Sequence, residues 1–349
     1  MPVRNPSRLL LALLAVFALL VAACGDDDSA ADDATEEPTA PSEDSDAADI
    51  GDDESGTDGT RTFVDVAGEE IEVPDVPERI VAIHDINAGV HLLSLGAPVV
   101  GIATREDGAR TDVTRYFDLD GIEEVGLTYE PNIEAIAALE PDLIVGEGFD
   151  GAGMDQFMTE GIQESLEQIA PVVYIDTFRP VEEVMADFEE LVGDAATESV
   201  DDQEAEFEAA FAELRDLLGD GWPDVAVSAV FSGEPLGIPG PANQVETEIL
   251  SRLGVSFTDV VRDVEGEGGF GELSSERIPE LESDLLVVTT AFDQNILDNP
   301  LYQALRVVQA GQVYEIDEPT AGTHWQNYTA VAEDLTAALS AMDFDTGLV

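Results

Sequence analysis

Three arginines stand close together in a chain that has few basic residues. Arg105, Arg110 and Arg115 fall within eleven residues, although the sequence holds only 13 basic residues, all of them arginine. A guanidinium group binds carboxylate or catecholate oxygens through paired hydrogen bonds and stays charged when desolvated. The cluster therefore favours binding of an anionic small molecule, with Arg105 and Arg115 the stronger candidates. The alternative is that these arginines pair with neighbouring acidic residues and fix a loop.

The histidines offer a second kind of chemistry. His84 and His324 lie in segments expected to be loops, so a Zn²⁺ or Mn²⁺ site made by two histidines and a carboxylate is an open alternative. His91 lies within an expected helix and is interpreted as a packing residue. The sequence has only these three histidines. It lacks the His-rich segment typical of zinc carriers, and we predict no resident cofactor.

Short apolar strands alternate with helices in two stretches of the chain, which is typical of parallel sheets covered on both faces. Strands are expected at 79–83, 99–103 and 172–175 in the first stretch, and at 225–231, 257–261 and 312–316 in the second. Helices are expected at 88–95, 246–253 and 328–342. Each stretch also contains a helix, a polar turn and a strand in sequence, at 132–145 and 274–288.

These last two units are copies of one pattern. Residues 132–145 and 274–287 share Glu, Ile, Leu, Glu and Asp at an offset of 142. Weaker matches relate 172–176 to 313–317 and 92–96 to 250–254. Three matches in the same order predict an α/β protein with two similar Rossmann-like lobes and mostly parallel sheets.

A helix-forming segment at 181–218 separates the two stretches. Gly193 is expected to break it, because glycine is costly inside a helix. Beyond this break, Phe207, Phe211, Leu214 and Leu218 form one apolar stripe. A helix of about 20 residues spans about 30 Å, so we predict a long, rigid helix that bridges the lobes.

The N-terminus is typical of an exported lipoprotein. Arg4 and Arg8 precede an apolar run of ~13 residues that is too short to span a bilayer. The run ends at Val21-Ala22-Ala23-Cys24, which resembles a bacterial lipobox, and Cys24 is the only cysteine. We therefore predict a signal peptide at 1–24, lipidation of Cys24 and a location on the extracytoplasmic face of the cell membrane.

An acidic segment follows the cysteine. Residues 25–60 hold 15 acidic side chains and no basic one, so this segment is predicted to be a disordered tether. The remaining boundaries are a first lobe at 61–178, bridging helices at 179–220 and a second lobe at 221–349.

The charge of the body restricts its partners. It holds 62 acidic residues against 11 arginines, a formal charge of −51. Such a surface excludes nonspecific nucleic-acid binding. It also suggests adaptation to high salt, where screening acts over a few ångströms.

At this point the chain resembles the helix-bridged periplasmic binding proteins that serve iron–siderophore, haem and vitamin B12 ABC importers. The resemblance covers residues 62–342. It rests on Pro77-Glu78-Arg79-Ile80-Val81-Ala82, on Leu92-Leu93-Ser94-Leu95-Gly96 with Val100-Gly101, on Leu191-Val192-Gly193, on Trp325 and above all on residues 131–144.

The resemblance implies a monomer that binds a ferric siderophore between its lobes and docks onto an ABC permease with its ATPase. Direct Zn²⁺ or Mn²⁺ binding, haem and cobamides stay open as alternatives. The expected cleft residues are His84, Arg105, Arg115, Tyr129, Phe231 and Trp325, with Phe292 weaker. A buried packing role is the alternative for Tyr129 and for Trp325. In the family a glutamate on each lobe pairs with permease arginines. Glu134 matches in the first lobe, and Glu248 is preferred over Glu246 in the second.

An enzyme is not expected. The sequence has no cysteine nucleophile, no Gly-x-Ser-x-Gly elbow, no phosphate loop and no dense metal motif. Paired carboxylates could indicate a glycosidase, but they arise by chance in a chain this acidic. An adhesin or structural module would not explain two α/β lobes joined by a long helix.

Overall fold

A computed structural model describes residues 59–105, 111–149, 151–153, 155, 158–159, 161–264, 270–291, 293–317 and 322–342. Cys24, the predicted signal peptide and the predicted acidic tether up to residue 58 lie outside these ranges, as do Arg110 and Phe292. No helix in the described ranges is both long and apolar enough to cross a membrane.

The first lobe is built on a mixed sheet with strand order β6-β5-β4-β3-β7-β8, and β9 also pairs with β7. The core strands β3, β4, β7 and β9 run parallel, whereas β6 and β8 are short antiparallel additions. Ile80, Val81, Ala82 and the residues of β9 up to Ile175 are buried, as expected for strands covered on both faces. The strands are β3 (Ile80–Ala82), β4 (Val99–Thr104), β5 (Glu123–Leu127), β6 (Glu130–Pro131), β7 (Leu143–Phe149), β8 (Ala152–Gly153) and β9 (Val172–Asp176).

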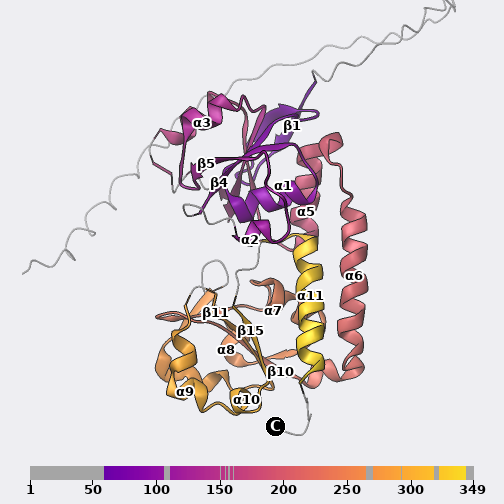
Figure 1. Ribbon diagram of the computed structural model, residues 1–349, viewed down its shortest axis with the longest axis vertical. Helices are drawn as coiled ribbons and strands as arrows, with labels where there is room; N and C mark the ends of the chain where they lie inside the picture. Colours follow the sequence, from indigo (N-terminus) through magenta and orange to yellow (C-terminus); the bar gives the residue numbers. More distant parts are fainter. Residues whose placement is uncertain are drawn as a thin grey trace, which may run out of the picture. The chain divides into compact units, whose positions relative to one another are not determined.

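Short helices and one hairpin complete this lobe (Figure 1). The hairpin pairs β1 with β2 in antiparallel register. The elements are β1 (Thr60–Val64), β2 (Glu70–Pro74), the π-helix η1 (Asp85–Gly89), α1 (Val90–Ser94), α2 (Thr111–Thr114), α3 (Ile133–Ala138) and α4 (Ile162–Glu167). The helix α5 (Val181–Val192) then begins the segment between the lobes.

The second lobe repeats the plan. Its sheet has the order β13-β11-β10-β14-β15, and β12 also pairs with β10. The strands are β10 (Ala226–Phe231), β11 (Leu236–Pro239), β12 (Ser256–Phe257), β13 (Phe270–Leu273), β14 (Leu285–Thr289) and β15 (Val313–Ile316). The helices are α7 (Val245–Arg252), α8 (Asp259–Arg262), η6 (Ser275–Leu281), η7 (Asn295–Asp298), α9 (Pro300–Gln303), α10 (Arg306–Gln309) and α11 (Trp325–Ser340).

The strand order confirms the prediction of two similar lobes. In the first sheet, β4-β3-β7-β9 lie side by side and parallel, and β12-β10-β14-β15 do the same in the second. In the aligned repeats, β7 of the first lobe corresponds to β14 of the second, and β9 corresponds to β15. The internal repeat in the sequence therefore reflects a repeat of the fold.

Two expected elements differ from the structure. Residues 275–281 form a 3₁₀ helix, not the α-helix of the first copy, and Pro279 lies inside it. Proline has no backbone N–H for an α-helical hydrogen bond and clashes with the preceding turn. The strand expected at 257–261 ends at Phe257, and the short helix α8 begins at Asp259. Asp259 in the first turn and Arg262 in the last turn both stabilise this helix, because their charges interact favourably with the helix dipole.

The segment between the lobes breaks at Gly193, as predicted. This residue ends α5 with φ of 51°, a conformation that glycine adopts at low cost. A 3₁₀ turn η3 (Gly193–Ala195) follows. The helix α6 (Val200–Asp216) is capped by Ser199, whose side chain accepts from the Asp202 N–H. A 3₁₀ helix η4 (Gly219–Asp224) then leads into β10.

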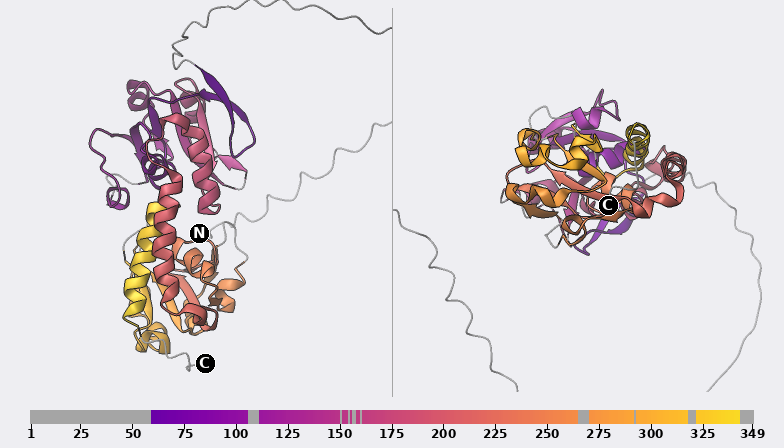
Figure 2. Two further views of the ribbon diagram at one scale, coloured as in Figure 1. Left: turned by 90° about the vertical axis from the view of Figure 1, so that its right-hand side faces the viewer. Right: turned by 90° about the horizontal axis from the view of Figure 1, so that it is seen from below.

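The long helix α6 lies beside the last helix, α11 (Figures 1 and 2). Phe207, Phe211 and Leu214 form the buried stripe of α6. Phe207 packs against Trp325 at 5.3 Å and against Tyr328 at 5.7 Å between ring centroids. Apolar and aromatic packing therefore joins the bridging helix to the second lobe.

Candidate ligand-binding cleft

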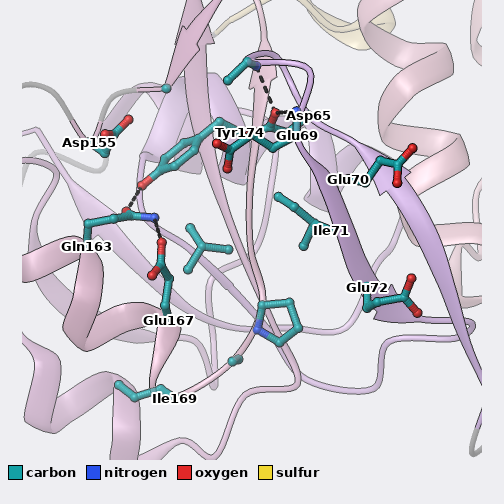
Figure 3. Close-up of a pocket in the computed structure, with 15 residues that line it drawn as sticks. Asp65, Glu69, Glu70, Ile71, Glu72, Asp155, Gln163, Glu167, Ile169 and Tyr174 are labelled. Carbon is teal, nitrogen blue, oxygen red and sulfur yellow. Dashed lines mark hydrogen bonds between the residues drawn. The ribbon is translucent and has the colours of Figure 1, made fainter.

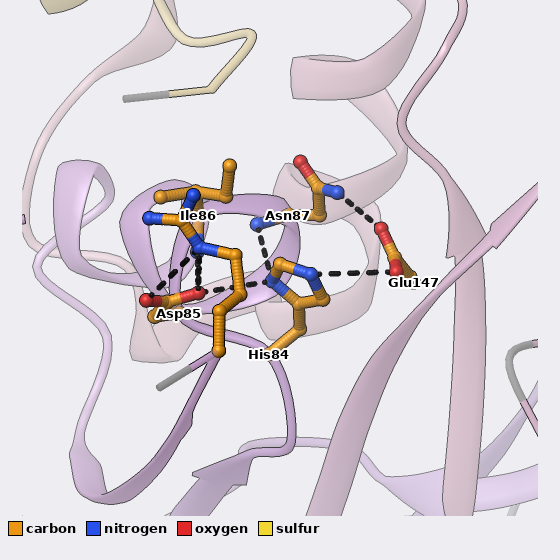
Figure 4. A network of polar contacts seen from close by, with 6 residues as sticks. His84, Asp85, Ile86, Asn87 and Glu147 are labelled. Atoms are coloured by element: carbon orange, nitrogen blue, oxygen red, sulfur yellow. Dashed lines mark hydrogen bonds and ion pairs between the residues drawn. The ribbon is translucent and has the colours of Figure 1, made fainter. Parts of the chain in front are cut away.

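A polar network follows the first strand of the first lobe (Figure 4). His84 and Asp85 come after β3, and both side chains are buried. His84 Nδ1 accepts from the Asn87 N–H at 3.2 Å, and its Nε2 lies 3.4 Å from Glu147 Oε1 on β7. The Asn87 amide also donates to Glu147. His84 Nδ1 also lies 3.2 Å from Asp85 Oδ1, so both ring nitrogens take part in the network.

Arg105 closes the other side of this network. Its Nε lies 3.0 Å from Asp85 Oδ1, and the arginine side chain is 28% exposed whereas Asp85 is fully buried. Burial alone would raise the pKa of Asp85. The hydrogen bond with His84 and the charge of Arg105 act against burial, and the pKa of Asp85 is lowered. The carboxylate is therefore charged, and it neutralises Arg105.

Next to the network is a cavity of about 240 Å³ between the lobes, which we call the interlobe cavity. Its first-lobe walls come from the loops after β3 and β9, and its second-lobe walls from the ends of β10, β14 and β15. The carboxyl ends of parallel strands are where open α/β sheets bind ligands. The lining residues are Ile86, Asn87, Thr177, Phe178, Arg179, Phe231, Ala242, Asn243, Gln244, Val245, Glu248, Phe270, Thr289, Ile316, Gly322, Thr323 and Tyr328.

Two buried polar atoms of this lining have no hydrogen-bond partner within the described residues. They are Gln244 Oε1 and Thr177 Oγ1. The Gln244 amide nitrogen is used, because it donates to Thr289 Oγ1 at 3.1 Å. A buried polar atom without a partner costs free energy, so a bound molecule could satisfy both atoms.

The charged residues of the lining are paired. Arg179 contacts Asp187, donates from Nε to the Asp176 carbonyl at 3.1 Å, and lies 3.6 Å from Glu183. Glu248 accepts from the Tyr328 hydroxyl and lies 2.6 Å from Arg252. The lining therefore carries no surplus of either charge.

A larger hollow, of about 820 Å³, lies on the first lobe between the β1–β2 hairpin and α4 (Figure 3). Its rim is acidic, with Asp65, Glu69, Glu70, Glu72, Asp155 and Glu167. The Tyr174 hydroxyl donates to Gln163 at its edge. Burial raises the pKa of Tyr174. This hollow receives no residue from the second lobe, so we take the interlobe cavity as the candidate site.

Some predicted cleft residues lie at this site. Phe231 lines the cavity and packs against Phe270 at 5.6 Å. His84 and Arg105 belong to the adjoining network, which reaches the cavity through Asn87. Tyr129 is 45% exposed. Burial and the charge of Glu147, a member of the network, raise the pKa of Tyr129.

Other predicted residues lie elsewhere. Arg115 lies 3.2 Å from Asp334 on α11 and packs over the Tyr116 ring, outside the cavity lining. Trp325 is 1% exposed and packs against Phe207, so it supports the cavity residue Tyr328 from behind. The structure therefore gives Trp325 the packing role that the sequence left open as an alternative.

Sequence reasoning missed Phe178, Arg179, Gln244 and Phe270. Phe178 and Arg179 follow β9. They would have been found if the expectation that ligands bind at the carboxyl ends of strands had been applied to β9 as well as to the first strands of each lobe. Gln244 directly precedes α7, and its backbone N–H donates to Thr247 Oγ1 at 3.3 Å. Its second role in the cavity depends on the fold.

The histidines do not form a metal centre in the described part of the chain. No group of three or more His, Cys, Asp or Glu side chains in these ranges could hold a metal ion. His324 is buried among aromatic rings, 5.4 Å from Tyr116 and 5.5 Å from Phe117. His91 stacks on Phe188 and contacts the Thr323 carbonyl at 3.0 Å, consistent with packing. Burial lowers the pKa of His91 well below 6.5.

Two α/β lobes with a bridging helix and a cavity between them are the architecture of a substrate-binding protein. Residues 80–320 match the periplasmic binding protein family, so the chain belongs to that family, in its iron–siderophore and vitamin B12 branch, as the sequence predicted. This is a family of solute-binding proteins.

Named relatives agree with this class. The chain is similar to a probable siderophore-binding lipoprotein, YfiY, from Bacillus subtilis, with 28% identity over 74% of this chain and 81% of the relative. It is also similar to the Fe(3+)-citrate-binding protein YfmC of the same bacterium, with 26% identity over 76% and 80%.

Solved structures show the same fold. The siderophore periplasmic binding protein from the fuscachelin gene cluster of Thermobifida fusca matches with a TM-score of 0.59 and 25% identity, over 77% of this chain and 99% of that one. The ferric-siderophore receptor DesE of Streptomyces coelicolor matches with a TM-score of 0.62 and 23% identity, over 81% and 99%.

Proposed function

We propose that this protein captures a ferric siderophore in the interlobe cavity and delivers it to an ABC importer, without catalysing a reaction. The cavity carries the proposal, because it draws its walls from strand ends of both lobes and contains buried polar atoms that lack a partner. Names of relatives support the ligand class: YfiY is described as siderophore-binding and YfmC as Fe(3+)-citrate-binding.

Within the cavity, Phe231, Phe270 and Phe178 supply apolar surface, and Phe178 is 55% exposed. Exposed aromatic side chains at a binding site are available for contact with a ligand. His84 and Arg105 are proposed to fix the loop that carries Asn87 to the cavity, and Tyr129 to flank the network. Trp325 and Arg115 are proposed to act from outside, through packing and through the ion pair with Asp334.

Delivery requires a docking surface on each lobe. Glu134 is exposed in the first turn of α3, which suits an ion pair with a permease arginine. Glu248 does not suit this role, because its side chain is only 14% exposed and is already bonded to Arg252 and Tyr328. Glu276 is the better second-lobe candidate. It matches Glu134 in the repeat, and it is exposed in the first turn of η6.

We further propose that the mature protein is a monomer anchored to the extracytoplasmic face of the membrane through a lipid on Cys24. The support is the lipobox-like sequence before the only cysteine and the description of YfiY as a lipoprotein. The acidic segment that follows would hold the body away from the membrane.

The proposal is tested by ligand titration. The full chain with Cys24→Ser would be titrated in high salt with ferric siderophores, haem, cobalamin, Zn²⁺ and Mn²⁺, with tryptophan fluorescence as readout. We expect saturable quenching by a ferric siderophore, and Phe231→Ala should weaken binding about tenfold through loss of apolar contact.

The matched control is Leu301→Ala, which truncates an exposed side chain on α9, away from the cavity lining. It should leave the dissociation constant unchanged. A response to Zn²⁺ or Mn²⁺ alone, or an equal loss in both variants, would contradict the proposed site.

A further inference from the structure

Resting on the proposed function, we propose that the cavity selects a ferric chelate of neutral or positive net charge, such as a ferric trihydroxamate, over anionic tris-catecholate or citrate complexes. The arginine cluster in the sequence favours an anionic ligand. The charge pairing in the folded protein reverses that expectation.

Among the residues that the structure describes, the arginines at or beside the cavity each have a carboxylate partner. Arg105 lies against the buried Asp85 at 3.0 Å. Arg179 contacts Asp187. Arg252, which packs over the Tyr328 ring at 5.7 Å, lies 2.8 Å from Glu182 and 2.6 Å from Glu248. An anionic chelate would have to compete with these carboxylates for the guanidinium groups, and it would approach the carboxylates closely.

The uncharged lining points the same way. Gln244 Oε1 is a buried acceptor without a partner in the described residues. It can accept a hydrogen bond from a ligand N–H or O–H, and it repels an anionic oxygen. The remaining polar lining consists of hydroxyls and amides such as Thr177, Thr289 and Asn243. The apolar part is formed by Phe231 and Phe270, 5.6 Å apart. Amide groups and methylene chains of a trihydroxamate match both kinds of surface.

The field around the cavity adds to this selection. A body charge of −51 repels an anion and attracts a cation at distances up to the Debye length, about 10 Å at 0.1 M salt and about 3 Å at 1 M. Salt should therefore change the two affinities in opposite directions.

The first test compares four chelates on the full chain with Cys24→Ser. They are a cationic linear ferric trihydroxamate, a neutral cyclic ferric trihydroxamate, a trianionic ferric tris-catecholate and ferric citrate. We expect a trihydroxamate to bind at least about tenfold more tightly than either anionic complex. Between 0.5 and 2 M NaCl (about the range in which screening still changes), the affinity for the cation should fall and that for anions should rise.

The second test removes one partner of Arg179. Asp187→Asn should tighten tris-catecholate binding about tenfold, because it removes the closer of the two carboxylates beside the guanidinium of Arg179, a residue of the cavity lining. The control is Glu280→Gln, which removes one carboxylate from the exposed Arg277 pair away from the cavity lining. It changes the net charge equally and should leave the affinity unchanged.

The outcomes separate the two proposals. Tightest binding of the tris-catecholate or ferric citrate would overturn the charge selection while supporting siderophore capture. Equal effects of Asp187→Asn and Glu280→Gln would show that only net charge matters and would overturn the role of Arg179 pairing. Binding of none of the four chelates by folded protein would overturn the proposed function and the selection together.

Discussion

Glu246 is a buried carboxyl group whose two oxygens have no hydrogen-bond partner in the described part of the chain. It lies in the first turn of α7, and its charge contributes to the raised pKa of Tyr116 and of Tyr314. Burial raises the pKa of Glu246 from 4.5 to about 7. Such a position is unsuitable for docking, and it makes Glu246 a source of pH-dependent stability.

Glu246→Gln should stabilise the protein at alkaline pH. Because the folded-state pKa is raised, the folded state holds the extra proton between pH 4.5 and about 7. The stabilising contribution is therefore present below pH 4.5 and lost as the pH rises through about 7. We expect the variant to gain up to about 3 kcal/mol in the free energy of unfolding at pH 8 and little at pH 4.5.

Urea unfolding of both proteins at the two pH values measures this difference. Glu276→Gln, at an exposed position, is the control and should change stability by less than about 0.5 kcal/mol. Equal stability of wild type and Glu246→Gln at pH 8 would contradict an ionised, unpaired Glu246.

At the scale of elements, the corresponding helices α3 and η6 carry the proposed docking glutamates. Glu134→Arg and Glu276→Arg should each reduce uptake at least about tenfold, because a like charge placed against a permease arginine costs several kcal/mol. Ligand affinity of the purified protein should stay within about twofold, since neither residue lines the cavity. Siderophore uptake in cells that express each variant measures the effect.

Glu208→Arg provides the control, because Glu208 is exposed on α6 and the substitution reverses the same charge. Normal uptake by both α3 and η6 variants would reject the docking surface. Loss of ligand affinity would instead assign these residues to binding.

At the scale of the whole molecule, the surplus of carboxylates makes the folded state dependent on salt. The body holds 62 acidic residues against 11 arginines, and folding brings these like charges closer together. We expect the melting temperature to rise by roughly 10 °C or more between 0.1 and 1 M NaCl (about the range in which the Debye length falls from 10 to 3 Å).

Thermal melts in NaCl and in sodium sulfate distinguish the causes. If screening is the cause, the melting temperature should level off near an ionic strength of about 1 M in both salts. If strengthened apolar burial is the cause, the melting temperature should continue to rise in sulfate. A melting temperature indifferent to NaCl would contradict salt adaptation.

Much of the fold could be predicted from local sequence. The apolar strands 80–82 and 285–289, the break at Gly193 and the stripe of Phe207, Phe211 and Leu214 follow from periodicity and backbone preference, which act over a few residues. The repeat predicted two lobes for the same reason, because equal local patterns give equal elements. Pro279 shows the limit, since the pattern matched a helix and the ring allowed only a 3₁₀ turn.

The site depended on the tertiary structure, because its residues meet partners far along the chain. Arg105 was predicted to bind a ligand, but the fold places it against Asp85; Arg115 meets Asp334, 219 residues away. Glu248 was predicted to be a docking residue, and Tyr328 contacts it across 80 residues. Sequence alone determined the two lobes and the charge. Which charges are neutralised and which rings are buried was decided by folding, because electrostatic and packing energies depend on distance in space.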